Sequence, residues 1–284
     1  MVKISEAISK LALELRHSVA NPRLEAEVLI SFALKKDKLW LITHKYDEIS
    51  SKDSEYIAKL GDKRASGMPA AYITGKKEFM SLEFTVNENV LIPRPETEEL
   101  VSYIIDLYSS RDNINILDLC TGSGAICCSL AYYIKGSHCT GIDIDENAIE
   151  TARHNAAKLS VDNRCSFLTG NVLEKINLNR KYDIVVSNPP YIESEVIPTL
   201  EKNVRDFEPL IALDGGDDGL VFYRAIVENA ELYLKNEGML FFEIGYNQGE
   251  ALKNIMSKKF DNIQIIKDLS GHDRIACGKL RYKR

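Results

Sequence analysis

The hydrophobic pattern of the chain changes once, near residue 75. Through residues 4–66, apolar side chains recur every three or four positions, which is the spacing of one face of an α-helix. From residue 79 onward, short apolar runs of strand length alternate with further helical segments. The pattern therefore predicts a helical segment followed by a larger α/β domain.

Residues 4–66 are expected to form four short amphipathic helices. Asparagine caps a helix end well and proline fits the first helical position, so Asn21-Pro22 marks the start of the second helix. Asp37 can cap the third helix, and Ser51 begins the fourth. The apolar residues that indicate these helices are Ile4, Ile8, Leu11 and Leu15; Leu24, Val28 and Phe32 on one face of the second; Leu39, Trp40 and Ile42; and Tyr56, Ile57 and Leu60.

We expect residues 1–75 to form one small bundle and residues 76–89 to form a β-hairpin that links it to the domain at 90–284. Apolar and polar side chains of the hairpin alternate with the two-residue period of a strand. Its apolar positions are Phe79, Leu82, Phe84 and Val86. Two interpretations of the bundle remain open: it docks a macromolecular partner, which we favour, or it is a structural cap on the larger domain.

The segment 90–284 has the pattern of a mostly parallel sheet covered by helices on both faces. Strands are predicted near 114–119, 138–143, 165–168, 182–187 and 238–244, and helices near 123–135, 145–159, 219–235 and 247–259. The last two strands, 262–268 and 273–279, are joined by so few residues that they must be antiparallel neighbours. The predicted fold class is α/β, a Rossmann-like sheet in which the last strand is reversed.

The segment before the sheet, residues 90–99, combines two prolines with acidic residues. Pro93 and Pro95 exclude a helix interior or a central strand. The glutamates after them suit the first turn of a helix. Arg94, held between the two prolines, is a candidate for the wall of a binding pocket. Phe79 is another, although core packing explains it better.

The most informative stretch is Ser187-Asn188-Pro189-Pro190-Tyr191, which ends a strand buried on both faces. The two prolines have no N–H and fix their φ angles, so the loop is stiff. The Asn188 side chain and the Pro189 carbonyl can accept the two hydrogens of a small planar NH₂ group, while the Tyr191 ring covers its face. An ordinary strand-to-loop turn is an equally good interpretation of these residues alone.

A second candidate site follows the strand at 114–119. The turn Cys120–Gly124 lets a ligand approach the backbone closely, just before a helix start. Asp143 ends the next strand, where its carboxylate can accept both hydroxyls of a ribose. Dinucleotide and P-loop motifs are absent, because Cys127 replaces the third glycine and no Gly-Lys-Ser/Thr follows. The glycine turn, the acid and the reversed last strand together point to S-adenosylmethionine.

The composition narrows the class of protein. Formal net charge is −6 over 284 residues, with 12 Lys+Arg against 10 Asp+Glu through Gly75 and 24 against 32 after it, so the main domain is acidic and matches a nucleic-acid backbone poorly. No apolar run approaches the roughly 20 residues of a membrane span, and the N-terminal pattern is not that of a signal peptide. We expect a cytoplasmic protein without membrane contact. The 6 cysteines and 5 histidines lack ligand spacing, which predicts reduced core cysteines and no metal.

These motifs resemble those of the release factor glutamine methyltransferases, class I enzymes that use S-adenosylmethionine, through nearly the whole chain. The matching segments are 91–98, 118–126, 188–191, 208–220, 243–248 and 268–274. Asn-Pro-Pro-Tyr is shared with adenine-N6 DNA methyltransferases and indicates amino-group chemistry. Its combination with Arg94–Glu98 and the 208–220 loop is far more specific.

The resemblance implies methyl transfer from S-adenosylmethionine to N5 of the glutamine in the Gly-Gly-Gln motif of peptide chain release factors, leaving S-adenosylhomocysteine. Asn188, Pro189 and Tyr191 are the expected catalytic residues and, with Pro190, the expected substrate contacts. The expected cofactor contacts are Cys120, Thr121, Gly122, Ser123, Gly124, Asp143, Asn171, Val172 and Asn188. A monomer suffices for this activity, and no metal or direct contact with nucleic acid is expected.

Two positions depart from the family pattern. Cys120 stands where the family commonly has glycine, so a residue with a side chain must adopt the backbone conformation of that turn. Asn171 and Val172 replace an acidic and an aromatic residue after Gly170. Asn171 can still bind the adenine amino group, but without charge, and Val172 covers the base less. Both departures are expected to change affinity for the cofactor.

Two other functions remain open. An adenine-N6 DNA methyltransferase would flip its base into the same holder, but the net acidity and the absence of a basic recognition region disfavour it. A nucleotide-binding protein without catalysis would bind the cofactor, yet it leaves the stiff Asn-Pro-Pro-Tyr loop without a purpose.

Overall fold

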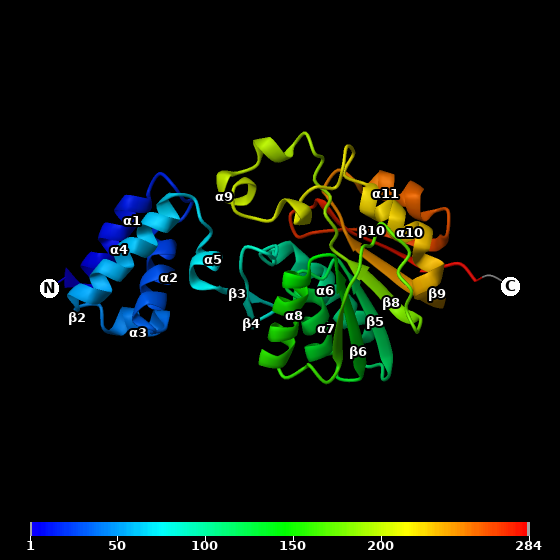
Figure 1. The fold of residues 1–284 in the computed structure, drawn as a ribbon, viewed down its shortest axis with the longest axis horizontal. Coiled ribbons are helices and arrows are strands. Elements are labelled where there is room, and N and C mark those ends of the chain that lie inside the picture. Colours follow the sequence, from blue (N-terminus) through cyan, green and yellow to red (C-terminus); the bar gives the residue numbers. More distant parts are fainter. Residues whose placement is uncertain (1, 283–284) are drawn as a thin grey trace. The chain divides into compact units, whose positions relative to one another are not determined.

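The computed structural model of the protein describes residues 2–282. The chain divides into two compact units, which are coloured along the sequence in Figure 1. The first unit comprises the chain through Lys76 together with Glu201–Phe207, and the second comprises Lys77–Leu200 and the chain from Glu208 onward. Each unit has its own apolar core.

The four predicted helices of the first unit are present. The side chains of Asn21, Asp37 and Ser50 each accept a hydrogen bond from the backbone N–H three positions on, so all three act as caps. The elements are β1 (Val2–Lys3), α1 (Ile4–Leu15), α2 (Pro22–Leu34), α3 (Lys38–Thr43), β2 (Glu48–Ile49), α4 (Ser51–Ala65), α5 (Ala70–Thr74) and, from the later segment, α9 (Lys202–Arg205). The short β1–β2 pair and helix α5 have no counterpart among the predicted elements.

Of the three apolar residues that indicate α2, only Phe32 packs against the core. Leu24 and Val28 are 44% and 39% exposed, respectively. The buried residues of this helix are Ala26, Leu29, Ile30 and Ala33. Both sets recur at helical spacing, so periodicity alone does not separate them. The face with two alanines faces the core, because small side chains let α2 pack closely against α1 and α4.

The second unit contains the predicted hairpin and the predicted sheet. Its elements are β3 (Lys76–Phe79), β4 (Leu82–Thr85), α6 (Pro95–Tyr108), β5 (Ile114–Leu119), α7 (Ala125–Tyr133), β6 (Ser137–Asp143), α8 (Glu146–Lys158), β7 (Cys165–Thr169), β8 (Tyr182–Ser187), α10 (Val221–Tyr233), β9 (Leu234–Glu243), α11 (Gly249–Met256), β10 (Phe260–Lys267) and β11 (Asp273–Leu280), with short 3₁₀ turns at Ile197–Thr199 and Leu210–Ala212. All predicted strands and helices of this unit are confirmed, with ends shifted by a few residues.

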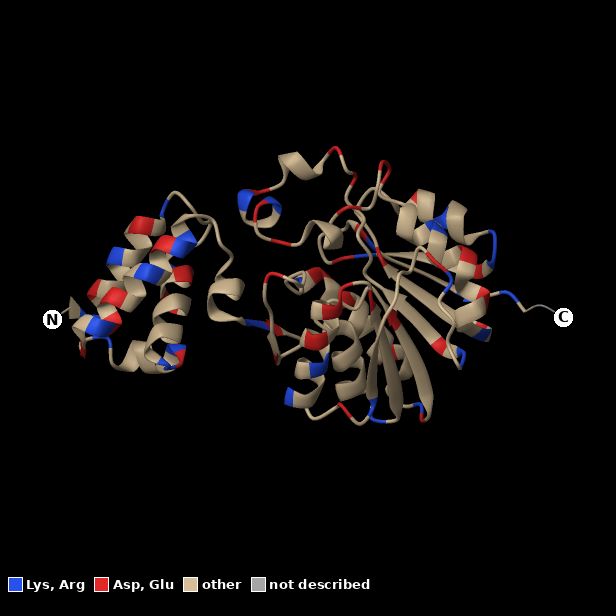
Figure 2. Cartoon of the chain, in the orientation of Figure 1, with Lys and Arg blue, Asp and Glu red and all other residues tan. Residues whose placement is uncertain are grey.

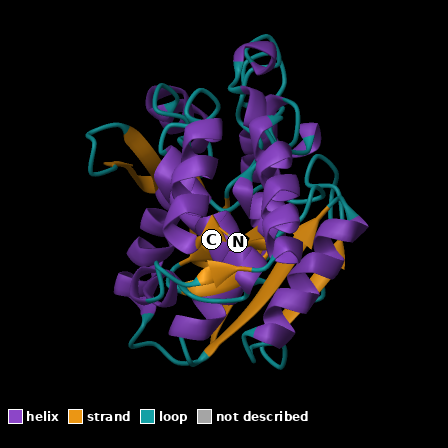
Figure 3. Ribbon diagram, turned by 90° about the vertical axis from the view of Figure 1, so that its left-hand side faces the viewer, coloured by secondary structure: helices purple, strands orange, loops and turns teal. Residues whose placement is uncertain are grey.

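The sheet has seven strands in the order β10-β11-β9-β8-β5-β6-β7. Strand β11 lies antiparallel to both of its neighbours, and the pairs from β9 to β7 are parallel. The reversed strand is therefore confirmed, and it lies inside the sheet instead of at its edge. Figure 3 shows the strands of the sheet in orange and the helices in purple. This is the predicted Rossmann-like sheet with one reversed strand.

The sheet is covered on both faces. Helices α6, α7 and α8 pack in one apolar cluster, which includes Phe79 at 0% exposure, and α10 and α11 pack in the other. Core packing for Phe79 is thus confirmed. Charged residues lie mainly on helices and loops, and the strands are largely uncharged (Figure 2). A central parallel sheet buried in this way leaves only strand ends and loops for polar chemistry.

Other expectations concern cysteines and membrane spans. Cys127, Cys128, Cys139 and Cys277 are buried, as expected, and none of the six cysteines forms a disulfide. Among residues 2–282, no helix has both the length and the apolar character needed to cross a bilayer.

Asn155 on α8 ties the hairpin to the turn after β5. Its side chain is 0% exposed. It accepts from the Thr85 N–H at 2.8 Å and donates to the carbonyls of Thr85 and Ser123 at 2.9 Å each. One buried amide therefore satisfies three backbone groups that are remote in sequence.

Replacing Asn155 by alanine should leave those three backbone groups unpaired. We expect Asn155→Ala to lower the free energy of unfolding by about 3 kcal/mol. The measurement is thermal unfolding followed by circular dichroism. Glu150→Ala, an exposed change on the same helix, is the matched control and should stay within about 0.5 kcal/mol of the parent. Equal midpoints for the two variants would contradict this assignment.

Candidate active site

The second unit has a cavity of about 220 Å³ where strands of its parallel sheet end. Strand β5 lies between β6 and β8, and the loops that follow these three strands form much of the wall. Ligands of open α/β sheets bind at this edge. The lining residues are Asn89, Val90, Leu91, Cys120, Gly122, Asp143, Ile144, Asp145, Ala148, Gly170, Asn171, Val172, Leu173, Asn188, Pro190, Ile211, Ala212 and Phe222.

The turn after β5 bends through left-handed backbone conformations. Cys120, Gly122 and Gly124 have φ angles of +61°, +54° and +75°. A residue with a Cβ adopts such a φ only with strain, so Cys120 occupies a position that glycine would fill more easily. Cys120 and Gly122 line the cavity. Burial raises the pKa of the Cys120 thiol well above its usual value, so the side chain stays neutral.

Three residues of the same turn lie behind the cavity wall. Thr121 and Ser123 are buried and, like Gly124, do not belong to the lining. The Thr121 hydroxyl donates to Asp118 at 2.6 Å. Burial raises the pKa of Asp118 to about 7. These residues hold the turn in shape and do not present side chains to the cavity.

Asp143 ends β6 at the cavity wall. One carboxylate oxygen accepts from the Gly122 N–H at 2.8 Å, and the other accepts from the Asp145 N–H at 3.1 Å. Each oxygen keeps a further lone pair. Burial raises the pKa of Asp143, although both hydrogen bonds oppose that shift. A half-buried carboxylate held in this way can accept two hydroxyl groups from a ligand.

Asn171 and Val172 form another part of the wall. The Asn171 side-chain oxygen accepts from the Leu173 N–H at 3.0 Å, and its NH₂ group donates to Glu174 at 3.1 Å. Val172 is 4% exposed and packs against the core. Both side chains line the cavity, so this departure from the pattern of the similar family lies where a ligand would be.

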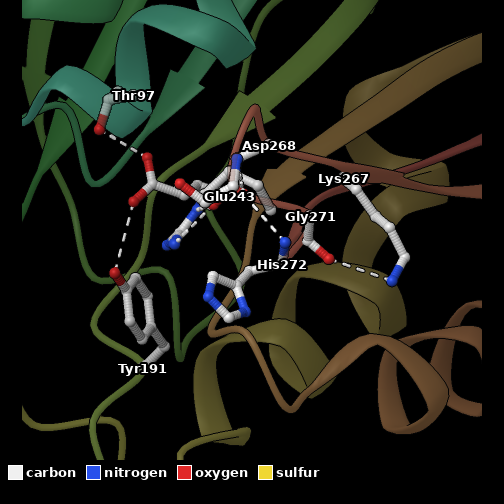
Figure 4. Close-up of polar contacts among 9 residues, drawn as sticks. Thr97, Tyr191, Glu243, Lys267, Asp268, Gly271 and His272 are labelled. Atoms are coloured by element: carbon white, nitrogen blue, oxygen red, sulfur yellow. Dashed lines mark hydrogen bonds and ion pairs between the residues drawn. The ribbon is translucent and has the colours of Figure 1, made fainter.

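Asn188 lies at the end of β8 with its amide held at one end. Its NH₂ group donates to the Thr97 hydroxyl at 3.2 Å, and Thr97 donates to one oxygen of Glu243 at 2.5 Å. The Tyr191 hydroxyl donates to the other Glu243 oxygen at 3.4 Å. Figure 4 shows Thr97 and Tyr191 on the two sides of the Glu243 carboxylate. Within residues 2–282, no group donates to the Asn188 side-chain oxygen, which leaves it available to a ligand.

Glu243 is 1% exposed, and burial is the main reason that its pKa is raised to about 7. Arg274 opposes this rise, but that guanidinium is itself paired with Asp268 at 3.2 Å. Burial also raises the pKa of Tyr191, so its hydroxyl remains a donor. The Glu243 carboxylate therefore accepts hydrogen bonds from two neutral hydroxyl groups, and near pH 7 it is partly protonated.

The backbone of Pro190–Tyr191 is fixed by a second loop. A Cβ on Gly219 would lie 2.4 Å from the Tyr191 carbonyl oxygen, and one on Gly215 would lie 2.8 Å from Tyr191 Cα. Gln248 donates to the Tyr191 carbonyl at 3.2 Å. The 208–220 loop thus packs directly on the tetrapeptide. Two of its residues, Ile211 and Ala212, line the cavity.

Arg94 does not line the cavity. Its guanidinium pairs with Glu208 at 2.5 Å. Glu208 is 5% exposed and also accepts from the Ile92 N–H at 3.4 Å. The arginine therefore fixes the segment before α6 to the 208–220 loop.

Most of the residues predicted for the site meet at one cavity. The lining includes Cys120, Gly122, Asp143, Asn171, Val172, Asn188 and Pro190. Thr121, Ser123, Gly124, Pro189 and Tyr191 lie behind it, with Pro189 buried and Tyr191 half-buried. Sequence reasoning assigned no role to Thr97 or Glu243. They are 146 positions apart, and only their presence in motif-like segments could have drawn attention to them.

Comparisons with known proteins show which family the chain resembles. Residues 110–279 match the family model described as a methyltransferase domain, and residues 6–75 match the PrmC N-terminal domain. The chain is 39% identical to the release factor glutamine methyltransferase of Clostridium acetobutylicum, over 96% of this chain and 97% of that one. It is 37% identical to the enzyme of that name from Bacillus subtilis, over 89% of each. A methyltransferase structure from Pyrococcus furiosus superimposes with a TM-score of 0.53 at 18% identity, covering 73% of this chain and 92% of that one.

Gly219→Ala should displace the Tyr191 carbonyl, because its methyl group would lie 2.4 Å from that oxygen. Gly271→Ala is the matched control: it also has a positive φ, +84° against +66°, but nothing lies within 4 Å of its Cβ. We expect Gly271→Ala to cost about 1–2 kcal/mol through backbone strain alone. Gly219→Ala should cost at least about 1–2 kcal/mol more. Equal unfolding midpoints would show that the close packing does not matter.

Proposed function

The chain belongs to the release factor glutamine methyltransferases, and we propose on that basis that it methylates N5 of the glutamine in the Gly-Gly-Gln motif of peptide chain release factors. The observation that carries the proposal is the Asn188 amide, whose NH₂ end is engaged while its oxygen stays available beside the cavity. A substrate carboxamide nitrogen presents two hydrogens, which such an acceptor can take. Methylation of adenine in DNA is not favoured, since the relatives are named for release factors and the chain is acidic.

S-Adenosylmethionine is the cofactor that we propose, and the cavity residues fit it. Asp143 would accept the ribose hydroxyls with the lone pairs that Gly122 and Asp145 leave unused. The left-handed turn at Cys120–Gly122 would let the amino-acid part approach the backbone. Asn171 and Val172 would lie against the adenine. When bound, this cofactor supplies a methyl group on a positively charged sulfur.

The protein's part in the chemistry is to orient the substrate. A carboxamide nitrogen is a weak nucleophile because its lone pair is shared with the carbonyl group. We infer that the Asn188 oxygen and the Pro189 carbonyl accept its two N–H bonds and turn the nitrogen toward the methyl donor. Such positioning can supply several kcal/mol of a barrier. With the donor bound, the nitrogen would gain the methyl group as the S–C bond of the donor breaks, and one of its own two protons would then leave to water.

Tyr191 has a supporting role in this proposal. Its hydroxyl is held by Glu243 and its carbonyl by Gln248, so its ring has little freedom. We propose that the ring covers one face of the substrate amide and helps to exclude water. Pro190, which lines the cavity, would contact the glutamine side chain.

Residues 1–75 are proposed to dock the release factor, with 76–89 as a linker and 90–284 as the catalytic domain. Exposed apolar side chains on and after α3 support docking: Leu39, Ile42 and Tyr46 are 70%, 59% and 69% exposed. Large exposed apolar residues that gather on one element are typical of protein interfaces. We propose that the protein acts in the cytoplasm, where release factors act. We also propose that it is a monomer.

Asn188→Ala should abolish methyl transfer without loss of the cofactor site. We expect kcat to fall at least about 100-fold, because the main acceptor for the substrate amide is lost. The dissociation constant for S-adenosylmethionine should stay within about threefold. Mass spectrometry of a release factor after reaction measures the rate of methyl transfer, and calorimetry measures the dissociation constant of S-adenosylmethionine. Asn254→Ala, an exposed change on α11, is the control. Undiminished turnover in Asn188→Ala would remove this residue from the mechanism.

Asp143→Ala should weaken cofactor binding at least about tenfold, because two charge-assisted hydrogen bonds to the ribose are lost. Asp143→Asn keeps one acceptor and should give an intermediate dissociation constant. Calorimetric titration of S-adenosylhomocysteine makes the measurement, with thermal unfolding as a check on folding. An unchanged constant in Asp143→Ala would contradict the ribose assignment.

A further inference from the structure

Glu243 lies at the end of β9, outside the cavity lining, and contacts the site only through other residues. One of its oxygens accepts from Thr97 and the other from Tyr191. Its backbone carbonyl accepts from the Tyr223 hydroxyl at 2.8 Å. Glu243 is therefore held at three points, two at its carboxylate and one at its backbone, and the two carboxylate contacts lead to the Asn-Pro-Pro-Tyr segment.

The direction of the hydrogen bonds follows from the number of hydrogens available. The Thr97 hydroxyl has one hydrogen, and it lies in the 2.5 Å contact with Glu243. Thr97 can then only accept in its 3.2 Å contact with Asn188. Because only the NH₂ end of an amide donates, the Asn188 oxygen must turn the other way.

The opposite arrangement would be inactive. If the Asn188 amide turned by 180° about its last bond, its NH₂ group would face the substrate NH₂ group. Two donors would then meet without an acceptor, and the substrate amide would lose its anchor. The asparagine in this segment is useful only in one of its two orientations.

We propose that Glu243 is a positioning residue, which acts through the Thr97 hydroxyl to keep the Asn188 oxygen directed at the substrate amide. The inference rests on the proposed role of Asn188 in methyl transfer. Glu243 touches neither the cavity nor the reacting atoms. Its effect is to decide which end of one amide the substrate meets.

Protonation of Glu243 should reverse this effect. As a carboxylic acid, Glu243 can donate to Thr97, whose hydroxyl is then free to donate to Asn188 and attract its oxygen. The charged or titratable groups that face Glu243 are Glu96 on α6, Arg274 on β11, Tyr191 after β8 and Tyr223 on α10. Burial outweighs Arg274 and raises the pKa of Glu243 to about 7. Turnover should therefore fall as pH decreases below about 7.

The same shift fixes the sign of the stability effect. The folded state binds the Glu243 proton more tightly than the unfolded state, since its pKa is raised from 4.5 to about 7. The contribution of Glu243 to the free energy of unfolding is therefore fully present below its unfolded pKa and is lost as pH rises through its folded pKa. Because glutamine does not titrate, the Glu243→Gln variant should not show this loss of stability at higher pH.

The experiment compares Thr97→Val with Thr97→Ser. Valine keeps the shape of threonine but has no hydroxyl, whereas serine keeps the hydroxyl. We expect Thr97→Val to lower kcat about 10- to 100-fold, with KM for the release factor and the dissociation constant of S-adenosylmethionine within about threefold. Thr97→Ser should retain kcat within about threefold. A Thr97→Val enzyme with parental kcat, or a Thr97→Ser enzyme as slow as Thr97→Val, would overturn the proposal.

A second measurement does not depend on the folding of Thr97→Val. The kcat of the parent and of Glu243→Gln is measured from about pH 5.5 to about pH 8.5 at saturating cofactor, so that titration of Asp143 in the cofactor site and of Asp118 behind it contributes little. The introduced glutamine has one acceptor oxygen and one NH₂ group, so, like the protonated acid, it can donate to Thr97 and cannot accept from both Thr97 and Tyr191. Its turnover at about pH 8 should therefore fall toward the turnover of the parent at about pH 5.5, and a Glu243→Gln enzyme with the parental kcat at about pH 8 would overturn the proposal. The acidic decline should disappear, and the unfolding midpoint at about pH 8 should be retained or raised. A decline that persists in Glu243→Gln would overturn the proposal. Failure of the parent to methylate a release factor would instead refute the proposed function itself.

Discussion

The single hydrogen of the Thr97 hydroxyl is the constraint on which the site depends. The hydroxyl group lies between the buried Glu243 carboxylate and the amide of Asn188. The direction in which it donates its hydrogen determines which end of that amide faces the cavity. The other contacts around the Asn-Pro-Pro-Tyr segment restrict the movement of its backbone, but they do not determine which end of the Asn188 amide faces the cavity. Pro189 and Pro190 fix the backbone, and Gln248 holds the carbonyl that follows. Stiffness alone would hold an asparagine in either orientation.

Buried or half-buried carboxylates recur near the same edge of the sheet. Asp118 in β5, Asp143 at the end of β6 and Glu243 at the end of β9 each have a pKa raised by burial. An ionised group in such a place costs stability, because desolvation disfavours the charged form. Each of the three is paired with hydroxyl or backbone N–H donors that lower this cost. This cost of stability is confined to positions next to the cavity, where polar groups are needed for binding and chemistry.

Local spacing predicted much of this structure. Strands of apolar residues and the short connection before Asp273 were sufficient for the sheet and its reversed strand. Asp143 and Asn188 could be placed together because parallel strands end at one edge. The family resemblance supplied the chemistry of that edge. What the pattern could not supply was contact between distant segments. Thr97 and Glu243 are separated by 146 positions, and no local rule pairs them.

Two further differences have physical reasons. The second helix has apolar residues at helical spacing on two faces, and packing against neighbouring helices chose the one with alanines. In the turn after β5, Thr121 and Ser123 match the motif but direct their polar groups into the protein, where they hold Asp118 and Asn155. A motif in the sequence thus marks a ligand-binding turn without separating the residues that meet the ligand from those that support the turn.

The most direct test of the central claim is a crystal structure of the protein with S-adenosylhomocysteine and a Gly-Gly-Gln peptide. The account predicts that the glutamine NH₂ group lies about 3 Å from the Asn188 side-chain oxygen, a normal hydrogen-bond distance, while the Asn188 NH₂ group remains on Thr97. A glutamine amide bound away from Asn188, or an Asn188 side chain whose oxygen faces Thr97, would contradict it.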